Sequence, residues 1–448
     1  MGGQKRARFQ HNQAASDVPT KSAKIQNPEA KKAASGPVSV NVAVGSYERL
    51  LYGFNLRMQA GKLQFKPLFM FPAHITCIKS VALSPPPPGS SKGGKWLITG
   101  GTDESIKVWD VRRRVEVGSL TGTEGATLRG LTTAADTVSK TSTANTLHTG
   151  TPLTMSFVNH AHLVIGTTHS NIYIFKCGEW ELLKSFRAHK GSVDSAAVHP
   201  KGGFAMTVGS DRMGQLWRLG KNSKESNRQA GHVGRIAGTK LGIEGRKGNP
   251  EVVKFSKSGN IIAIMFKQHV EMRNTQGFEL LPPLPWLPAK LTTKFNDIGF
   301  ARPLKSQGFD DGVEFFAVAS EDKRVLLYAI KEGEESAFVA ELVGHQNRIK
   351  SVRFGLVADL LLAITISSDG FVRAFDLSAL TKSSKQVQLE CVAAYNTKGT
   401  RITCLDVASA GYEDEGDAEE SEDQDVQENE SEQEQEQEEE EKEEEDDE

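Results

Sequence analysis

One pattern recurs three times in this chain and limits its fold more than any other feature. The copies are LITGGTDESIKVWD at 97–110, AMTVGSDRMGQLWRL at 205–219 and AITISSDGFVRAFDL at 363–377. In each copy a Thr is followed four residues later by an Asp, and six residues after the Asp comes an aromatic residue. A His in a small-residue context precedes each copy, in Ala73-His74, Ala188-His189 and Gly344-His345. Agreement at four positions indicates an architecture built from repeated units.

The spacing fits a buried hydrogen-bond relay inside a blade of four strands, which is the WD40 pattern. The His would lie on the loop that enters the blade, the Thr on the second strand, the Asp in the next turn and the aromatic residue on the third strand. Each polar group then has a partner, so its burial is tolerated. The predicted relay residues are His74, Thr99, Asp103 and Trp109; His189, Thr207, Asp211 and Trp217; and His345, Thr365 and Asp369. Phe375 has no N–H group, so the third relay should end one step early.

Weaker copies of the pattern fill the gaps, at 163–175, 252–274 and 316–328, which gives six blades between about 72 and 395. The two ends of the chain would make the seventh. Residues 40–56 and 63–71 supply three strands without a first one, and RITCLDV at 401–407 is a first strand with nothing after it. We therefore predict an all-β, seven-bladed propeller whose N- and C-terminal strands share one blade, which removes both open edges.

The charge of the chain is divided between its regions. Residues 1–37 carry seven Lys+Arg and two acids, which predicts a disordered basic segment before a propeller at 38–411. Residues 412–448 carry 24 Asp+Glu and one Lys, which predicts a disordered acidic tail. The formal net charge of −3 thus conceals +20 in residues 1–411 and −23 in the tail. This asymmetry favours nucleic acid or a basic partner. The tail either keeps the protein soluble, or it contacts basic proteins or competes with RNA for the basic patch.

Several stretches resemble one WD40 family, the nucleolar assembly factors known as Mak-type proteins in fungi and as the PAK-interacting protein in animals. They are VGSYERLLYGFNL, EWELLKSFRAHKGSVDSAAVHPKGGFAMTVGSDRMGQLWRL, GHQNRIKSVRF with SSDGFVRAFDL, and NTKGTRITCLDV, and the resemblance runs from about 40 to 408. It implies a nuclear, nucleolar scaffold in maturation of the large (60S) ribosomal subunit, bound to other assembly factors, ribosomal proteins and pre-rRNA. The animal members are also described as restraining a p21-activated kinase, so a signalling adaptor is the alternative.

One face of such a propeller carries the loops that join the first to the second strand and the third to the fourth. In blades one to three these connections are predicted to hold many cations, with Glu179 as the main nearby acid: Lys92, Lys95, Arg112, Arg113, Arg114, Lys176, Lys201, Arg218 and Lys221. We predict a positive patch that contacts RNA phosphates or an acidic partner. The alternative is that each is an ordinary solvated side chain.

The sequence offers no catalytic, metal or cofactor site. His160, His162 and His169 have no Cys or carboxylate at ligand spacing, and GSSKGGK at 89–95 lacks the order of a phosphate-binding loop. The four cysteines are too widely spaced for a disulfide framework, which favours a reducing compartment. The sequence has no run of 18 apolar residues, so no membrane span is predicted. We therefore predict a protein that is not an enzyme and has no small-molecule substrate.

Overall fold

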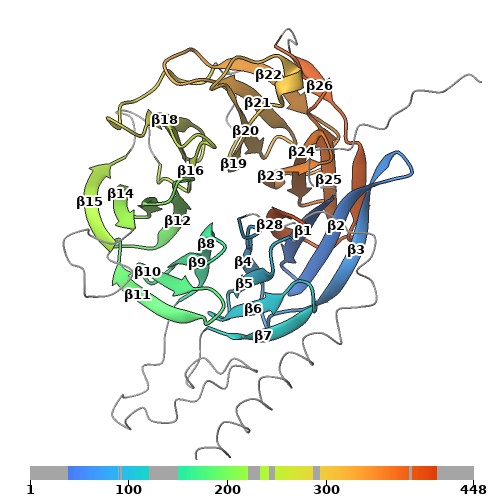
Figure 1. Cartoon of the computed structure of the whole chain (residues 1–448). Coiled ribbons are helices and arrows are strands. Elements are labelled where there is room, and N and C mark those ends of the chain that lie inside the picture. The colour runs from blue at the N-terminus through green and yellow to red at the C-terminus, as the bar shows by residue number, and fades with distance from the viewer. Residues whose placement is uncertain are drawn as a thin grey trace, which may run out of the picture. The chain divides into compact units, whose positions relative to one another are not determined.

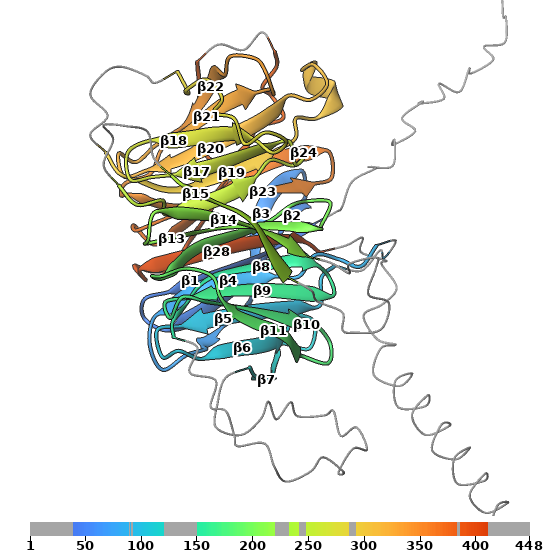
Figure 2. The same ribbon diagram turned by 90° about the vertical axis from the view of Figure 1, so that its left-hand side faces the viewer.

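Seven β-sheets are arranged in a ring in the computed structural model (Figure 1), and residues of their inner strands line a cavity on its axis, here called the channel. The structure describes residues 39–88, 90, 93–120, 150–219, 233–241, 248–285, 293–382 and 386–410. These residues form 28 strands and one short 3-10 helix, η1 (Lys305–Gln307). We call the strands of each blade a to d from the channel outward. The view from the side shows the blades stacked around the ring (Figure 2).

The first four blades follow the chain in order. Blade one contains β4 (Ile78–Leu83), β5 (Trp96–Gly101), β6 (Ile106–Asp110) and β7 (Val115–Ser119). Blade two contains β8 (Pro152–Asn159), β9 (His162–Thr167), β10 (Asn171–Lys176) and β11 (Glu181–Arg187). Blade three contains β12 (Val193–Val198), β13 (Phe204–Gly209), β14 (Met213–Leu219) and β15 (Val233–Lys240). Blade four contains β16 (Val252–Phe255), β17 (Ile261–Met265) and β18 (Val270–Asn274).

The remaining blades depart from simple chain order. Blade five contains β19 (Phe295–Ala301), β20 (Glu314–Ser320), β21 (Val325–Ile330) and β22 (Ala337–Leu342), with β26 (Val387–Leu389) added in parallel to β22. Blade six contains β23 (Ile349–Val357), β24 (Leu360–Ser367), β25 (Phe371–Asp376) and β27 (Ala393–Asn396). Blade seven contains β28 (Ile402–Ser409), β1 (Ser39–Ser46), β2 (Leu50–Gln59) and β3 (Lys62–Pro72).

Blade seven closes the ring by pairing strands from opposite ends of the described chain. Antiparallel β28 and β1 place Val407 opposite Val42 and Leu405 opposite Val44. The predicted all-β, seven-bladed propeller with one shared blade is therefore confirmed. The predicted disordered segments 1–37 and 412–448 lie outside the described residues.

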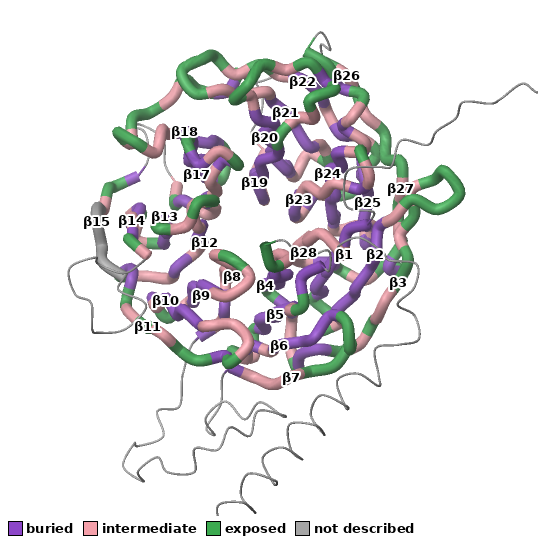
Figure 3. Tube along the Cα trace, viewed as in Figure 1, coloured by how far each residue is buried: buried purple, intermediate pink, exposed green. Residues whose placement is uncertain are grey.

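The apolar core is divided into seven clusters in the described part of the chain, one between each pair of neighbouring blades. A single strand serves two of them because its side chains alternate between faces. Leu97 of β5 faces blade seven and the next residue, Ile98, faces blade two. Buried segments follow the inner and middle strands, whereas exposed segments follow the outer loops (Figure 3). No helix within the described residues is long and apolar enough to cross a membrane.

Candidate functional site

A buried relay ties the loop before blade one to the two middle strands of that blade. His74 Nδ1 lies 3.2 Å from both carboxylate oxygens of Asp103, and His74 Nε2 lies 2.8 Å from Thr99 Oγ1. The indole N–H of Trp109 donates to the same Thr99 oxygen at 2.9 Å. Because a carboxylate only accepts hydrogen bonds, His74 carries its proton on Nδ1 and the Thr99 hydroxyl donates to Nε2.

Blade three repeats this geometry. His189 Nδ1 lies 2.9 Å from Asp211, and His189 Nε2 lies 2.9 Å from Thr207. The Trp217 indole N–H donates to Thr207 at 2.9 Å. The structure thus brings together the predicted residues of the first two relays.

The local electrostatics keep the first relay in one protonation state. Burial lowers the pKa of His74, although the Asp103 charge acts in the opposite direction. Burial opposes ionisation of Asp103, but hydrogen bonds from Ser105, the His74 charge and a hydrogen bond from the Ile75 amide together lower the pKa of Asp103. At neutral pH the His is therefore neutral and the Asp is ionised, which is the pairing that the relay requires.

The third relay differs from the sequence prediction at Asp369. His345 Nε2 lies 2.9 Å from Thr365 Oγ1, and the His345 ring stacks on Phe375 with centroids 5.4 Å apart. Asp369 does not bond to the His345 ring but pairs with Arg373, whose Nη1 lies 3.0 Å from Asp369 Oδ2. Burial and the Arg373 charge lower the pKa of His345 to about 4.

The reason for this difference lies across the strand from the Thr. Arg373 faces Thr365 in the β24–β25 ladder, where the other two copies have Lys107 and Gln215. Arg373 is only 5% exposed, and a buried guanidinium needs an ionised partner. It therefore takes the carboxylate that the His would otherwise hold.

We expect Thr207→Val to lower the free energy of unfolding by about 2–4 kcal/mol, because His189 and the Trp217 indole both lose a buried partner. The matched variant is Thr365→Val, in which only His345 loses its partner because Phe375 has no donor. Its loss should be about half as large. Chemical denaturation of both variants measures the difference, and equal losses would contradict this role for the relay.

The predicted cations that the structure describes lie at the face formed by the a–b and c–d loops, here called the a–b face. Six of them are exposed: Lys95, Arg112, Arg113, Arg114, Lys201 and Arg218. Lys92 and Lys221 lie outside the described residues. Lys176 and Arg218 are not in loops as the sequence predicted, because β10 extends to Lys176 and β14 extends past Arg218.

Two of the predicted cations are partly neutralised by nearby acids. Lys176 pairs with Glu179 at 2.8 Å, and Lys95 lies 3.9 Å from Asp110. The c–d loop of blade one is the strongest part of the predicted patch, because it presents three consecutive arginines. Asp110 Oδ1 fixes this turn by accepting from the amides of Arg112 and Arg113 at 2.9 and 3.0 Å.

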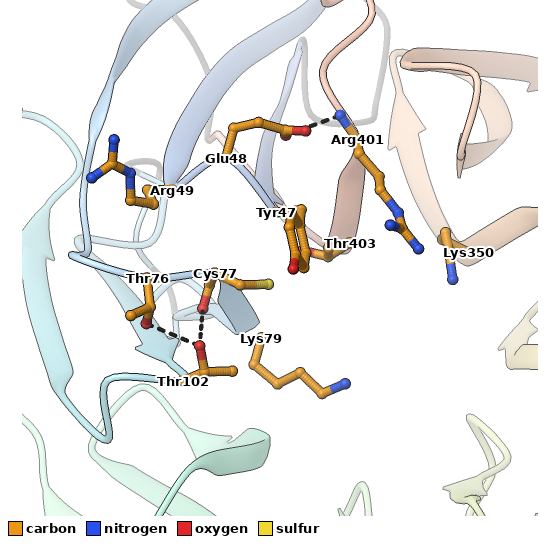
Figure 4. Close-up of a pocket in the computed structure, with 10 residues that line it drawn as sticks. All are labelled: Tyr47, Glu48, Arg49, Thr76, Cys77, Lys79, Thr102, Lys350, Arg401 and Thr403. Atoms are coloured by element: carbon orange, nitrogen blue, oxygen red, sulfur yellow. Dashed lines mark hydrogen bonds between the residues drawn. The ribbon is translucent and has the colours of Figure 1, made fainter.

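A second group of cations lies on the opposite face, here called the d–a face, and the sequence reasoning missed it. A cavity of about 870 Å³ opens there beside blades six, seven and one. The side chains of Lys79, Lys350 and Arg401 line this opening, with Tyr47 beside Arg401, and Arg49 lies on the other side of Tyr47 (Figure 4).

β-Bulges place two of these lysines at the mouth of the channel. The register of β4 with β5 shifts between Ile78 and Ser80, and the register of β23 with β24 shifts between Ile349 and Ser351. Lys79 and Lys350 are the extra residues, and a bulge redirects a side chain that the ladder would otherwise fix. One signal for them existed, because the tripeptide Ile-Lys-Ser opens both strands.

The cavity is suited to binding an anion rather than to chemistry at a metal or a thiolate. No group of three or more His, Cys, Asp or Glu side chains in the described ranges could hold a metal ion. Burial raises the pKa of Cys77 in the cavity wall, so its thiol is not activated.

Comparison with known proteins agrees with this fold. A model of the WD domain, G-beta repeat, matches residues 65–110 and 180–218. The chain contains WD40 repeats. The chain is 24% identical over 372 residues to "p21-activated protein kinase-interacting protein 1-like" of Danio rerio. The aligned region covers 83% of this chain and 81% of the relative.

Two fungal relatives extend the comparison. "Protein MAK11" of Saccharomyces cerevisiae is 25% identical over 391 residues, covering 83% of this chain and 84% of its own. "Shk1 kinase-binding protein 15" of Schizosaccharomyces pombe is 29% identical over 185 residues, covering 40% of this chain and 44% of its own. The family resemblance predicted from the sequence is confirmed by these homologues.

Proposed function

We propose that this protein is a non-catalytic scaffold in assembly of the large ribosomal subunit, bound to other assembly factors, ribosomal proteins and pre-rRNA in the nucleolus. The observation that carries the proposal is the division of charge. Residues 1–411 have a net charge of +20, and blade one presents Arg112, Arg113 and Arg114 on a hydrogen-bonded turn. The phosphates of RNA attract a protein region with this positive charge over long distances. Similarity to MAK11 along most of both chains supports the proposal.

A signalling adaptor that binds and inhibits a p21-activated kinase is the second candidate. The observation that favours it is the naming of relatives as kinase-interacting or kinase-binding proteins. We rank it second because binding a kinase does not require so large an excess of positive charge in residues 1–411.

Reversing the three charges of the blade-one loop tests the RNA contact. In the variant Arg112→Glu, Arg113→Glu, Arg114→Glu we expect less cosedimentation with pre-60S particles. We also expect the slope of log affinity for single-stranded RNA against log salt concentration to fall by about 2 to 3, since each lost phosphate contact removes about 0.7–0.9.

A matched variant separates position from total charge. Lys190→Glu, Arg212→Glu, Lys240→Glu makes the same change in net charge at the d–a face, in two loops of blade three and at the last residue of β15, where all three side chains are exposed. It should retain most of the binding. Unchanged cosedimentation of the blade-one variant would remove this loop from the proposed interface.

A further inference from the structure

Three of the cations that line the cavity at the channel mouth come from three different parts of the chain. Lys79 comes from blade one, Lys350 from blade six, and Arg401 from the loop before β28 (Figure 4). Within the part of the chain that the structure describes, none of the three forms an ion pair. Glu48, the carboxylate in the cavity wall, accepts from the backbone amide of Arg401 at 3.0 Å. The three side chains repel one another, and an anion between them would relieve that repulsion.

The pKa of Lys350 is consistent with this repulsion. Burial, with the positive charges of Arg348, Arg401 and Lys79, lowers the pKa of Lys350, and the Glu321 charge acts in the opposite direction. Lys350 and Lys79 are held on bulges of two rigid strands, so the positions of their backbones are fixed before any ligand arrives. A preorganised site of this kind loses little entropy when it binds an anion.

The surroundings of the three cations suit a side chain that enters from outside. Tyr47 is 57% exposed, and the Arg401 guanidinium lies 5.3 Å from the centre of its ring, so one wall is aromatic. Ile75, in the loop next to the cavity, is 80% exposed and offers an apolar contact to flanking residues. Below the mouth, the charged residues that line a cavity of about 190 Å³ are Lys79, Lys254, Lys350 and Arg353, with the carboxylates of Asp194 and Asp297.

The rest of the mouth argues against a nucleic acid strand. An adjoining cavity of about 580 Å³ shares Lys79, but Asp194 and Glu251 line it. The lysine next to Glu251, Lys294, is already paired with it at 3.0 Å. An extended polyanion across the mouth would place phosphates against these carboxylates, whereas a single anionic group can lie between Lys79, Lys350 and Arg401.

We infer that Lys79, Lys350 and Arg401 form a binding site for one compact anionic side chain, phosphorylated or carboxylic, carried by a peptide segment of a partner protein. The inference goes beyond the proposed function, since it holds for a ribosomal or a signalling partner. The peptide lies on the d–a face and its anionic side chain points into the channel. This site is separate from the arginine loop of the a–b face.

Fluorescently labelled peptide pools with random flanks test the site on the full chain. The central residue is fixed as phosphoserine, glutamate or serine, and binding is followed by fluorescence anisotropy. We expect at least one anionic pool to bind about tenfold more tightly than the serine pool, which corresponds to about 1.4 kcal/mol. Tighter binding of the phosphoserine pool identifies a phosphorylated partner, and equal binding of both anionic pools identifies a carboxylate.

Two variants locate the effect. In Lys79→Gln, Lys350→Gln the anionic pools should bind no better than the serine pool, and the melting temperature should not fall because neither lysine forms an ion pair in the described structure. The matched variant Lys267→Gln, Lys294→Gln removes two charges from the adjoining cavity and should keep the preference. Equal binding of all three pools, or a preference that survives loss of Lys79 and Lys350, would overturn the inference. The inference would also be overturned if the affinity for a random RNA fell more on loss of these two lysines than the affinity for the anionic pools did.

Discussion

Ending the chain before Arg401 is expected to abolish cooperative folding, whereas ending it after Gly411 should leave the melting temperature unchanged. The first truncation removes β28, and with it Ile402 and Leu405 from the core cluster between blades six and seven. It also opens the edge of β1 and removes the inner strand of blade seven. A domain of net stability about 5–15 kcal/mol does not survive such a loss. Circular dichroism during heating measures both truncations.

A point substitution in the same strand provides a graded form of this test. Leu405 is 2% exposed, so Leu405→Ala should lower the free energy of unfolding by about 2–5 kcal/mol. A synthetic peptide spanning 401–411, added to the shorter truncation, should restore part of the cooperative transition. If both truncations melt alike, β28 does not close the ring.

Replacing Asp297 with Ala is expected to have the second largest effect. Asp297 of blade five accepts hydrogen bonds from three groups of blade six: the Ser351 hydroxyl, the Val352 amide at 3.3 Å and Arg353 Nη1 at 2.5 Å. When the Asp297 carboxylate is removed, the Arg353 guanidinium keeps one acidic partner, Asp406 of blade seven, whose Oδ1 lies 3.6 Å from Arg353 Nε. We expect the free energy of unfolding to fall by about 3 kcal/mol, the low end for a broken buried ion pair, because this second partner remains.

The control for this prediction is a pair of the same chemistry in solvent. Asp310 and Lys382 lie 2.7 Å apart with side chains 54% and 60% exposed. Because water screens such a pair, Asp310→Ala should not change stability measurably. Equal effects of the two substitutions in urea denaturation would mean that Asp297 does not link blades five and six.

The fold follows from the sequence because its repeats carry local information. Thr99 and Trp109, ten residues apart, fix the pairing of two strands within one blade, and the same spacing recurs in blade three. The closure of blade seven could also be predicted, since RITCLDV has the pattern of a first strand and residues 40–71 have the pattern of the three strands that follow it.

The charged sites are harder to predict from the sequence because they depend on contacts between distant segments. Arg373 takes Asp369 away from His345, and only the cross-strand position of that arginine explains the change. Lys79 and Arg401 belong to opposite ends of the propeller, so their convergence requires the closed ring. Pairing of Lys176 with Glu179 likewise removes charge that a count of loop cations includes.

The most direct test of the proposed scaffold role is purification of the tagged full-length protein from cells, with its bound RNA and proteins quantified together. We predict that pre-rRNA and large-subunit ribosomal proteins copurify in amounts comparable to the protein itself, and that the Arg112→Glu, Arg113→Glu, Arg114→Glu variant recovers less of both. Recovery of a stoichiometric kinase without pre-rRNA would contradict the assembly role and establish the signalling adaptor in its place.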